Sequence, residues 1–302
     1  MKSSNAKIIA INRSSKFYPL VIIYIVIVSI YMLWHRAWFS PDQFFAVALF
    51  AILFIGRLST FLSDWAPLLV LFFSYEYLRG LAPILNGEAH IMAMINVDKF
   101  IFGFVPPIKL QQILHSTNGP HWYDYVASAL YISYFIVPMM VGFLFWLYDA
   151  NLFKKYMRAL LFLSFAAFVT YVLFPAMPPW LASQNGYLPK LAKIMDASMA
   201  NFGQPINLPS TYKFLRADQV AAVPSLHAAY PFLIFLFLGR KSKRLALLTS
   251  PYVLGVWFSV IYLGEHYFID VLLGAIYAAF SYFIVLNFAK IRKTAIHLAS
   301  FV

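Results

Sequence analysis

The sequence predicts an all-α fold, a polytopic membrane helical bundle with about eight transmembrane helices. Of the 302 residues, 62% are hydrophobic and 11% are charged, whereas a soluble domain is about half apolar and a quarter charged. The mean hydropathy is +0.74. The apolar residues also occur in runs close to the roughly 20 residues that a spanning helix needs. These runs cover residues 17–34, 44–60, 64–79, 122–147, 157–176, 225–239, 246–263 and 267–289.

The first three runs form the least regular part of this pattern. The run at 17–34 follows a basic tail, and no small-residue cleavage site follows it. We therefore interpret it as an uncleaved span rather than a signal peptide. Arg57 and Asp64 interrupt the next long apolar stretch, so we expect a short loop between the second and third spans.

The distribution of Lys and Arg orients the spans. With the N-terminus placed inside, fifteen of the 23 basic residues fall on short inner segments, as the positive-inside rule requires. Eight spans then put both termini in the cytoplasm. Two long loops, at 80–121 and 177–222, lie on the outer side. Their local apolar stretches predict amphipathic helices that lie on the membrane surface.

The net charge of +12 is explained by this orientation. Lys and Arg concentrate on cytoplasmic loops and near anionic headgroups, so we do not expect nucleic acid as a partner. The sequence contains no cysteine, which excludes disulfides and Cys-ligated metals. The sequence also offers no convincing carboxylate cluster for a metal ion.

Two histidines and an aspartate fall at the outer ends of the last spans. His227 lies in "AAVPSLHAAYPFLIFLFL", directly after Pro224 and Ser225, which are typical of a helix start. His266 and Asp270 open the final span, and a spacing of four residues puts them on one face of a helix. Because only a few residues connect the last two spans, we expect all three side chains at a similar depth.

Each of these residues has an alternative explanation. A single His at a helix start is often an interfacial anchor, and Asp270 could simply hold His266 or cap the helix. Asp270, however, lies about one turn inside an apolar span, where an ionisable group is costly and marks a functional site. A His–Asp pair also fixes the tautomer of the imidazole and stabilises its cation. We therefore interpret the three residues as a catalytic group, and the other histidines as interfacial or solvated.

The residues around this group resemble a known family. "PSLHAAYP" and "GEHYFIDVLLG" resemble the second and third signature motifs of the type 2 phosphatidic acid phosphatase superfamily. Leu226, where the superfamily has Gly, and "FPAMPPW" are closer to the branch of the inositol phosphorylceramide synthases and their bacterial relatives. The resemblance covers residues 64 to 289 and implies a catalytic transmembrane domain, 61–302, with a six-helix core. Residues 1–60 are then the N-terminal tail and accessory helices.

The resemblance implies a phosphoryl-transfer mechanism. His266 would attack phosphorus and form a phosphohistidine, while Asp270 would orient the ring and stabilise its cation. His227 would protonate the leaving oxygen and then act as base on the acceptor, which is water or an alcohol. No metal or other cofactor is required. Independently of the resemblance, the topology puts helix starts at the outer ends of both spans, and helix starts favour an anion. Ser225 would supply a hydroxyl or backbone donor to the phosphate.

The sequence departs from the superfamily in the basic residues that bind phosphate. The region of the first motif, "YVLFPAMPPW", has no Lys or Arg, and Val260 stands where the third motif usually has Arg. Phosphoryl transfer still needs cationic or N–H donors. The outer-side candidates are Arg79, Lys213 and Arg216.

The three candidates are not equivalent. Arg216 is preferred to Lys213, because a planar guanidinium suits phosphate oxygens. Both could instead form a surface that binds lipid headgroups, and Arg79 could form an ion pair with Glu76 three residues earlier.

Two reactions share the first half-reaction, in which His266 attacks phosphorus. A phosphotransferase would move an inositol-phosphate-type headgroup from a phospholipid donor onto a lipid alcohol such as ceramide. A lipid phosphate phosphatase would hydrolyse a phosphatidate- or polyprenyl-type monoester. The synthase-like motifs and the missing cations favour the transferase, since a diester carries less charge than a monoester.

A transporter is a third alternative. It is disfavoured because the titratable groups cluster at one face rather than along a path through the membrane. Either enzyme would be integral to a bacterial inner membrane or a eukaryotic endomembrane, with its site on the non-cytoplasmic side.

Overall fold

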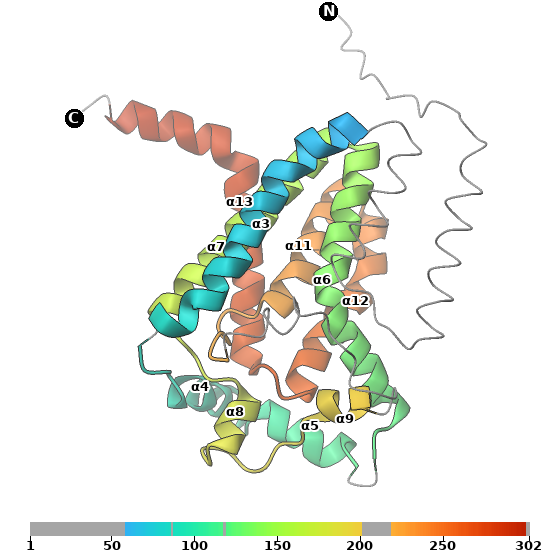
Figure 1. The fold of residues 1–302 in the computed structure, drawn as a ribbon, viewed down its shortest axis with the longest axis vertical. Coiled ribbons are helices and arrows are strands. Elements are labelled where there is room, and N and C mark those ends of the chain that lie inside the picture. The colour runs from blue at the N-terminus through green and yellow to red at the C-terminus, as the bar shows by residue number, and fades with distance from the viewer. Residues whose placement is uncertain (1–57, 86, 117–118, 201–218, 300–302) are drawn as a thin grey trace, which may run out of the picture.

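The computed structural model describes residues 58–85, 87–116, 119–200 and 219–299, which form helices joined by loops (Figure 1). In chain order the helices are α3 (Leu58–Leu85), α4 (Met92–Phe102), α5 (Pro106–Leu114), α6 (Trp122–Tyr148), α7 (Ala150–Leu173), α8 (Pro179–Gln184), α9 (Ile194–Ala200), α11 (Leu226–Lys241), α12 (Lys243–Tyr262) and α13 (Phe268–Ala299). The predicted span at 17–34, and that at 44–60 up to residue 57, lie outside the described residues.

Among the described residues, six long helices form a bundle, and four short helices gather at one end of it (Figure 1). Helices α3 and α7 end there, whereas α6, α11 and α13 begin there. Helix α11 contacts α6, α7, α12 and α13. The short helices come from the two predicted outer loops, α4 and α5 from the first and α8 and α9 from the second. The described parts of both loops therefore lie over the same end of the bundle.

Three of the described helices are long and apolar enough to cross a membrane: Ala150–Leu173, Lys243–Tyr262 and Phe268–Phe288. Helix α6 is a fourth if its halves, which are bent by 50° to each other, form one span. The described residues thus confirm the helical fold, and their apolar helices fit an integral membrane protein. The full count of eight spans and the cytoplasmic position of both termini stay predictions.

Helix α3 corrects one expectation. The loop predicted between the second and third spans, at residues 61–63, is helical, because α3 runs without a break from Leu58. The carboxylate of Asp64 accepts a hydrogen bond from the indole N–H of Trp146 at 2.9 Å. A half-buried carboxylate with a partner does not require a break in the helix. Helix α3 also continues to Leu85, so Arg79 lies inside it rather than at its end.

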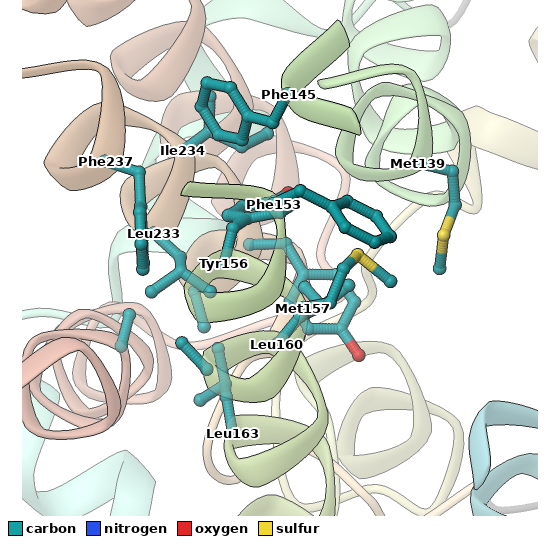
Figure 2. Packing of buried hydrophobic residues seen from close by; sticks show 14 of the residues in the cluster. Met139, Phe145, Phe153, Tyr156, Met157, Leu160, Leu163, Leu233, Ile234 and Phe237 are labelled. Atoms are coloured by element: carbon teal, nitrogen blue, oxygen red, sulfur yellow. The ribbon is translucent and has the colours of Figure 1, made fainter. Parts of the chain in front are cut away.

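The interior of the bundle is filled by aliphatic and aromatic side chains of α7 and α11 (Figure 2). Phe153, Tyr156 and Leu160 of α7 and Leu233 and Phe237 of α11 are all at most 1% exposed. The rings of Tyr156 and Phe237 meet edge to face, with centroids 5.4 Å apart. Lipid tails are as apolar as these side chains, so close packing rather than exclusion of water holds the helices together.

Backbone hydrogen bonds join three loop segments beside the start of α11. The N–H of Met177 donates to the carbonyl of His90 at 3.1 Å, and the N–H of Ala222 donates to that of Ala176 at 3.2 Å. The ring of His90 stacks on Phe174, with centroids 4.0 Å apart. These contacts fix the segment that leads into the motif around His227.

Candidate active site

His227, His266 and Asp270 meet at the end of the bundle that the short helices cover. Nδ1 of His227 lies 3.2 Å from Nε2 of His266, and Nδ1 of His266 lies 3.4 Å from Oδ2 of Asp270. His266 is 5% exposed and Asp270 is fully buried, while His227 is half-buried. The structure therefore brings together the three residues that were singled out in the sequence.

The start of α11 is fixed by Ser225 and by close contact with α13. The hydroxyl of Ser225 accepts from the N–H of Ala228 at 3.3 Å, which is a typical N-cap. Its own N–H donates to the carbonyl of Asp270 at 3.0 Å. This approach requires Gly274, because a Cβ there would lie 2.3 Å from the carbonyl oxygen of Ser225. The two helices that carry the histidines thus touch through their backbones.

The start of α13 follows a tight turn. Gly264 has a φ of +77°, a left-handed conformation that favours glycine. The N–H of His266 donates to the carbonyl of Val260 at 3.1 Å. Oδ2 of Asp270 accepts from the N–H of Tyr267 at 2.9 Å. Asp270 therefore holds both the turn that precedes its helix and the ring of His266.

Asp98 of α4 reaches the same turn from a distant part of the chain. Its carboxylate is fully buried and accepts from the N–H of Phe268 at 3.0 Å and of Ile269 at 3.1 Å. Burial raises the pKa of Asp98 to about 6, and the nearby charge of Asp270 adds to the rise, while the two N–H donors oppose it. Because carboxylates take these N–H groups, the start of α13 is not open to a phosphate, contrary to expectation.

Two tyrosines of α6 hold the ring of His227. The ring of Tyr131 stacks on it at a centroid distance of 4.2 Å, and that of Tyr134 lies 3.7 Å from it at an angle of 43°. The two tyrosines are three residues apart, on one face of their helix. They restrict the orientation of the imidazole without taking either of its nitrogens.

A pocket opens beside the two histidines. Its described lining residues are Tyr75, Arg79, Tyr134, Tyr171, Ala221, Leu226, His227, Tyr230 and His266. Arg79 is the one Lys or Arg among them. In the part of the chain that the structure describes, no three His, Cys, Asp or Glu side chains are arranged to hold a metal ion.

The predicted phosphate-binding residues have different positions. Arg79 faces the pocket with both histidines. Its alternative partner, Glu76, has a side chain outside the described ones. Ser225 is fully buried and its hydroxyl caps α11. Lys213 and Arg216 lie outside the described residues.

Sequence reasoning missed Asp98, Tyr131 and Tyr134. Asp98 is an acidic residue in an apolar segment, "MINVDKFIF", and this is a signal that was available. The i, i+3 spacing of the tyrosines in "YISY" was also visible. Neither pattern says which element the side chains contact, so neither identifies a site residue by itself.

The sequence model of the type 2 phosphatidic acid phosphatase (PAP2) superfamily matches residues 95–284, which is more than half of the chain. The chain belongs to the PAP2 superfamily. The PAP2 region contains both histidines, Asp270 and Asp98, and begins after Arg79. This confirms the resemblance that the two motifs indicated, and it identifies an enzyme that acts on lipid phosphate.

Three relatives within the PAP2 superfamily match the predicted branch. The phosphoinositol dihydroceramide synthase of Bacteroides thetaiotaomicron is 28% identical over 262 residues, 83% of this chain and 86% of the relative. The inositol phosphorylceramide synthase of Candida albicans is 31% identical over 113 residues, 34% of this chain and 22% of the relative. The catalytic subunit of the Saccharomyces cerevisiae enzyme is 30% identical over 122 residues, 36% and 29% of the two chains. No solved structure matches the chain.

Proposed function

We propose that this protein is an integral-membrane phosphotransferase that moves an inositol-phosphate-type headgroup from a phospholipid onto a lipid alcohol such as ceramide. The proposal rests on the alignment of Asp270, His266 and His227. Oδ2 of Asp270 lies 3.4 Å from Nδ1 of His266, and Nε2 of His266 lies 3.2 Å from Nδ1 of His227. Such a row combines an oriented nucleophile with a proton-transfer group. The bacterial relative is named for a phosphoinositol headgroup and dihydroceramide, which supports these substrates.

The position of Asp270 gives the imidazole rings of His266 and His227 different roles. Its carboxylate lies beside Nδ1 of His266 and favours a proton on that nitrogen, so the lone pair remains on Nε2. Nε2 faces Nδ1 of His227, which is then the hydrogen-bond donor. His266 thus carries the nucleophilic nitrogen, and His227 carries the proton that a leaving group needs.

In the first half-reaction Nε2 of His266 attacks phosphorus. An N–P bond forms and the P–O bond to diacylglycerol breaks, while His227, as the imidazolium, gives its Nδ1 proton to the departing oxygen and becomes neutral. Because the two nitrogens are only 3.2 Å apart at rest, the donor phosphate replaces their hydrogen bond when it binds. Asp270 stabilises the positive charge that develops on the imidazole of His266.

In the second half-reaction the acceptor alcohol attacks the phosphohistidine. Its hydroxyl proton passes to His227, a P–O bond forms, and the P–N bond to His266 breaks. Both rings return to their starting states. Water in place of the alcohol would complete the alternative reaction, hydrolysis.

Charge in the pocket favours a phosphodiester donor. A diester carries one negative charge, and Arg79 is the one Lys or Arg that lines the pocket among the described residues. We propose Arg79 as the phosphate-binding cation of the described region. Lys213 and Arg216 remain predictions for the same role.

The arrangement of basic residues supports a site on the non-cytoplasmic side. Arg240, Lys241, Lys243 and Arg244 are exposed at the end of the bundle opposite to the two histidines, and such clusters remain in the cytoplasm. An impermeant thiol reagent tests the orientation, since the chain has no cysteine of its own. Outside intact cells, the reagent should label Lys190→Cys but not Lys243→Cys. The reverse pattern would contradict the proposal.

The activity is tested with purified protein and a phosphatidylinositol donor, with and without ceramide. We expect diacylglycerol and a new inositol-phosphate sphingolipid, both dependent on ceramide. Phosphate release from a monoester, without headgroup transfer, would favour the phosphatase. His266→Ala should lower kcat by about 10³-fold or more. Lys190→Ala changes an exposed residue at the same end of the bundle and is the control.

A further inference from the structure

We propose that Asp98, on the short helix α4, is a positioning residue for the catalytic pair His266 and Asp270. It does not touch the reacting atoms, and it acts through the backbone of the turn that carries both residues. The inference rests on the proposed function, because the role is defined by its effect on catalysis.

The contacts of Asp98 lie between the two catalytic residues in the sequence. One carboxylate oxygen accepts from the N–H of Phe268 at 3.0 Å, and the other accepts from the N–H of Ile269 at 3.1 Å. A helix start leaves its first N–H groups without intrahelical partners. Two bonds from one rigid carboxylate therefore fix both the position and the direction of the first turn of α13.

Helix α4 is a firm support for this carboxylate. Met94 and Ile95 are buried and pack in one cluster with Val223 and Tyr267. Val223 lies shortly before His227 in the sequence, and Tyr267 directly follows His266. Helix α4 thus packs in one cluster with residues close to both histidines, so we expect a shift of α4 to change the distance between them.

Asp98 also keeps Asp270 available for His266. Asp270 lies at the third position of α13, where a carboxylate commonly turns back to cap its own helix. It already accepts from the N–H of Tyr267 at 2.9 Å. Without Asp98, two further N–H groups would compete for Asp270. The carboxylate that faces Nδ1 of His266 would then spend less time there.

The first test compares Asp98→Asn with Asp196→Asn. The amide of Asp98→Asn keeps the size of the side chain but presents one oxygen to two N–H groups. We expect kcat to fall by roughly tenfold or more, with KM changed by less than about threefold, because only orientation is lost. Asp196 is exposed on α9, and its variant should behave like the wild type. Unchanged kcat in folded Asp98→Asn, or a change confined to KM, would overturn the proposal.

The second test leaves Asp98 in place and removes one of the N–H groups that it accepts. Phe268→Pro deletes that N–H at the first helical position, where proline is tolerated. Phe268→Ala loses the same aromatic ring but keeps the N–H, so it is the matched control. We expect kcat of Phe268→Pro to be several-fold below that of Phe268→Ala. Equal values would overturn the proposal, and this pair decides the question if Asp98→Asn does not fold.

A third measurement needs no substrate and separates this inference from the proposed function. Diethyl pyrocarbonate modifies neutral imidazoles, and mass spectrometry of the peptide reports the rate at His266. With Asp270 held less firmly and one negative charge lost, we expect a several-fold faster modification of His266 in Asp98→Asn. An unchanged rate would overturn the role of Asp98, even if the wild type transferred a headgroup. A faster rate would support it, even if the wild type proved to be a phosphatase, and a slower rate would contradict it.

Discussion

The two helix starts that form the site, those of α11 and α13, are held in opposite ways. The backbone of α11 is capped locally by Ser225, while the ring of His227 is held by tyrosines from another helix. The backbone of α13 is capped by the distant Asp98, while the ring of His266 is held locally by Asp270. Each histidine thus depends on one local and one distant contact. The alignment of the two rings therefore depends on the whole end of the bundle.

The largest loss of activity is expected from a change at the contact between the starts of α11 and α13. Gly274→Ala places a Cβ 2.3 Å from the carbonyl oxygen of Ser225 and must push the two helix starts apart. We expect kcat/KM to fall by about 100-fold, since a displacement near 1 Å has an effect of that size. Gly255→Ala meets only the end of the flexible Leu130 side chain, at 3.1 Å, and should retain activity. Equal activities of the two variants would show that the contact is not needed.

Tyr134 tests the distant contact of His227. Tyr134→Leu removes the ring that lies 3.7 Å from the imidazole, so His227 gains orientations that are unproductive for proton transfer. We expect about a tenfold loss of kcat. Tyr134→Phe keeps the ring and should lose much less. If both variants lose activity equally, the hydroxyl rather than the ring is the important group.

The pH dependence of stability tests the distant contact between Asp98 and the start of α13. The pKa of Asp98 is about 6 in the folded protein and 3.8 as the ordinary value, so the folded state binds the proton more tightly. Protonation of Asp98 therefore stabilises the folded state below pH 4, and this contribution is lost as the pH rises to about 6. Over that range the free energy of unfolding falls by at most roughly 1.4 kcal/mol per pH unit. The nearby titratable groups are Asp270 and Tyr267.

The measurement is the thermal midpoint of the wild type and of Asp98→Asn from pH 4 to 7. The advantage of the wild type should shrink as the pH rises, while its kcat relative to the variant should grow. A difference in stability that is independent of pH would contradict a titration of Asp98 in this range.

Ser225 gives the smallest expected effect, because its contact is local. Ser225→Ala should lower stability by about 1 kcal/mol, and Ser225→Gly by a few tenths. The backbone bond to Asp270 remains in both, so kcat should change only a few-fold. A large rise in KM for Ser225→Ala would instead support the predicted contact with phosphate.

The distinction between local and distant contacts also explains what could be predicted from the sequence. The pairing of His266 with Asp270 follows from a spacing of four residues, and Ser225 is a recognisable helix cap, so both were visible. The partners Asp98, Tyr134 and Gly274 come from other elements, and their roles depend on packing that no local pattern encodes. Arg79 was expected beside the site, but α3 was expected to end there. The break expected near Asp64 is also absent, because the bond between Asp64 and Trp146, which joins two distant segments, gives the carboxylate a partner inside the helix.

The hydrogen bond between the two histidines has a consequence for the proton balance of the enzyme. Two nitrogens 3.2 Å apart share one proton, and a second would put two positive charges side by side. On the proposed mechanism that proton leaves with diacylglycerol and is replaced by the hydroxyl proton of the acceptor. Transfer between alcohols is thus a closed cycle that needs no exchange with water. Hydrolysis is not closed, since it consumes water and yields a phosphomonoester that can ionise further.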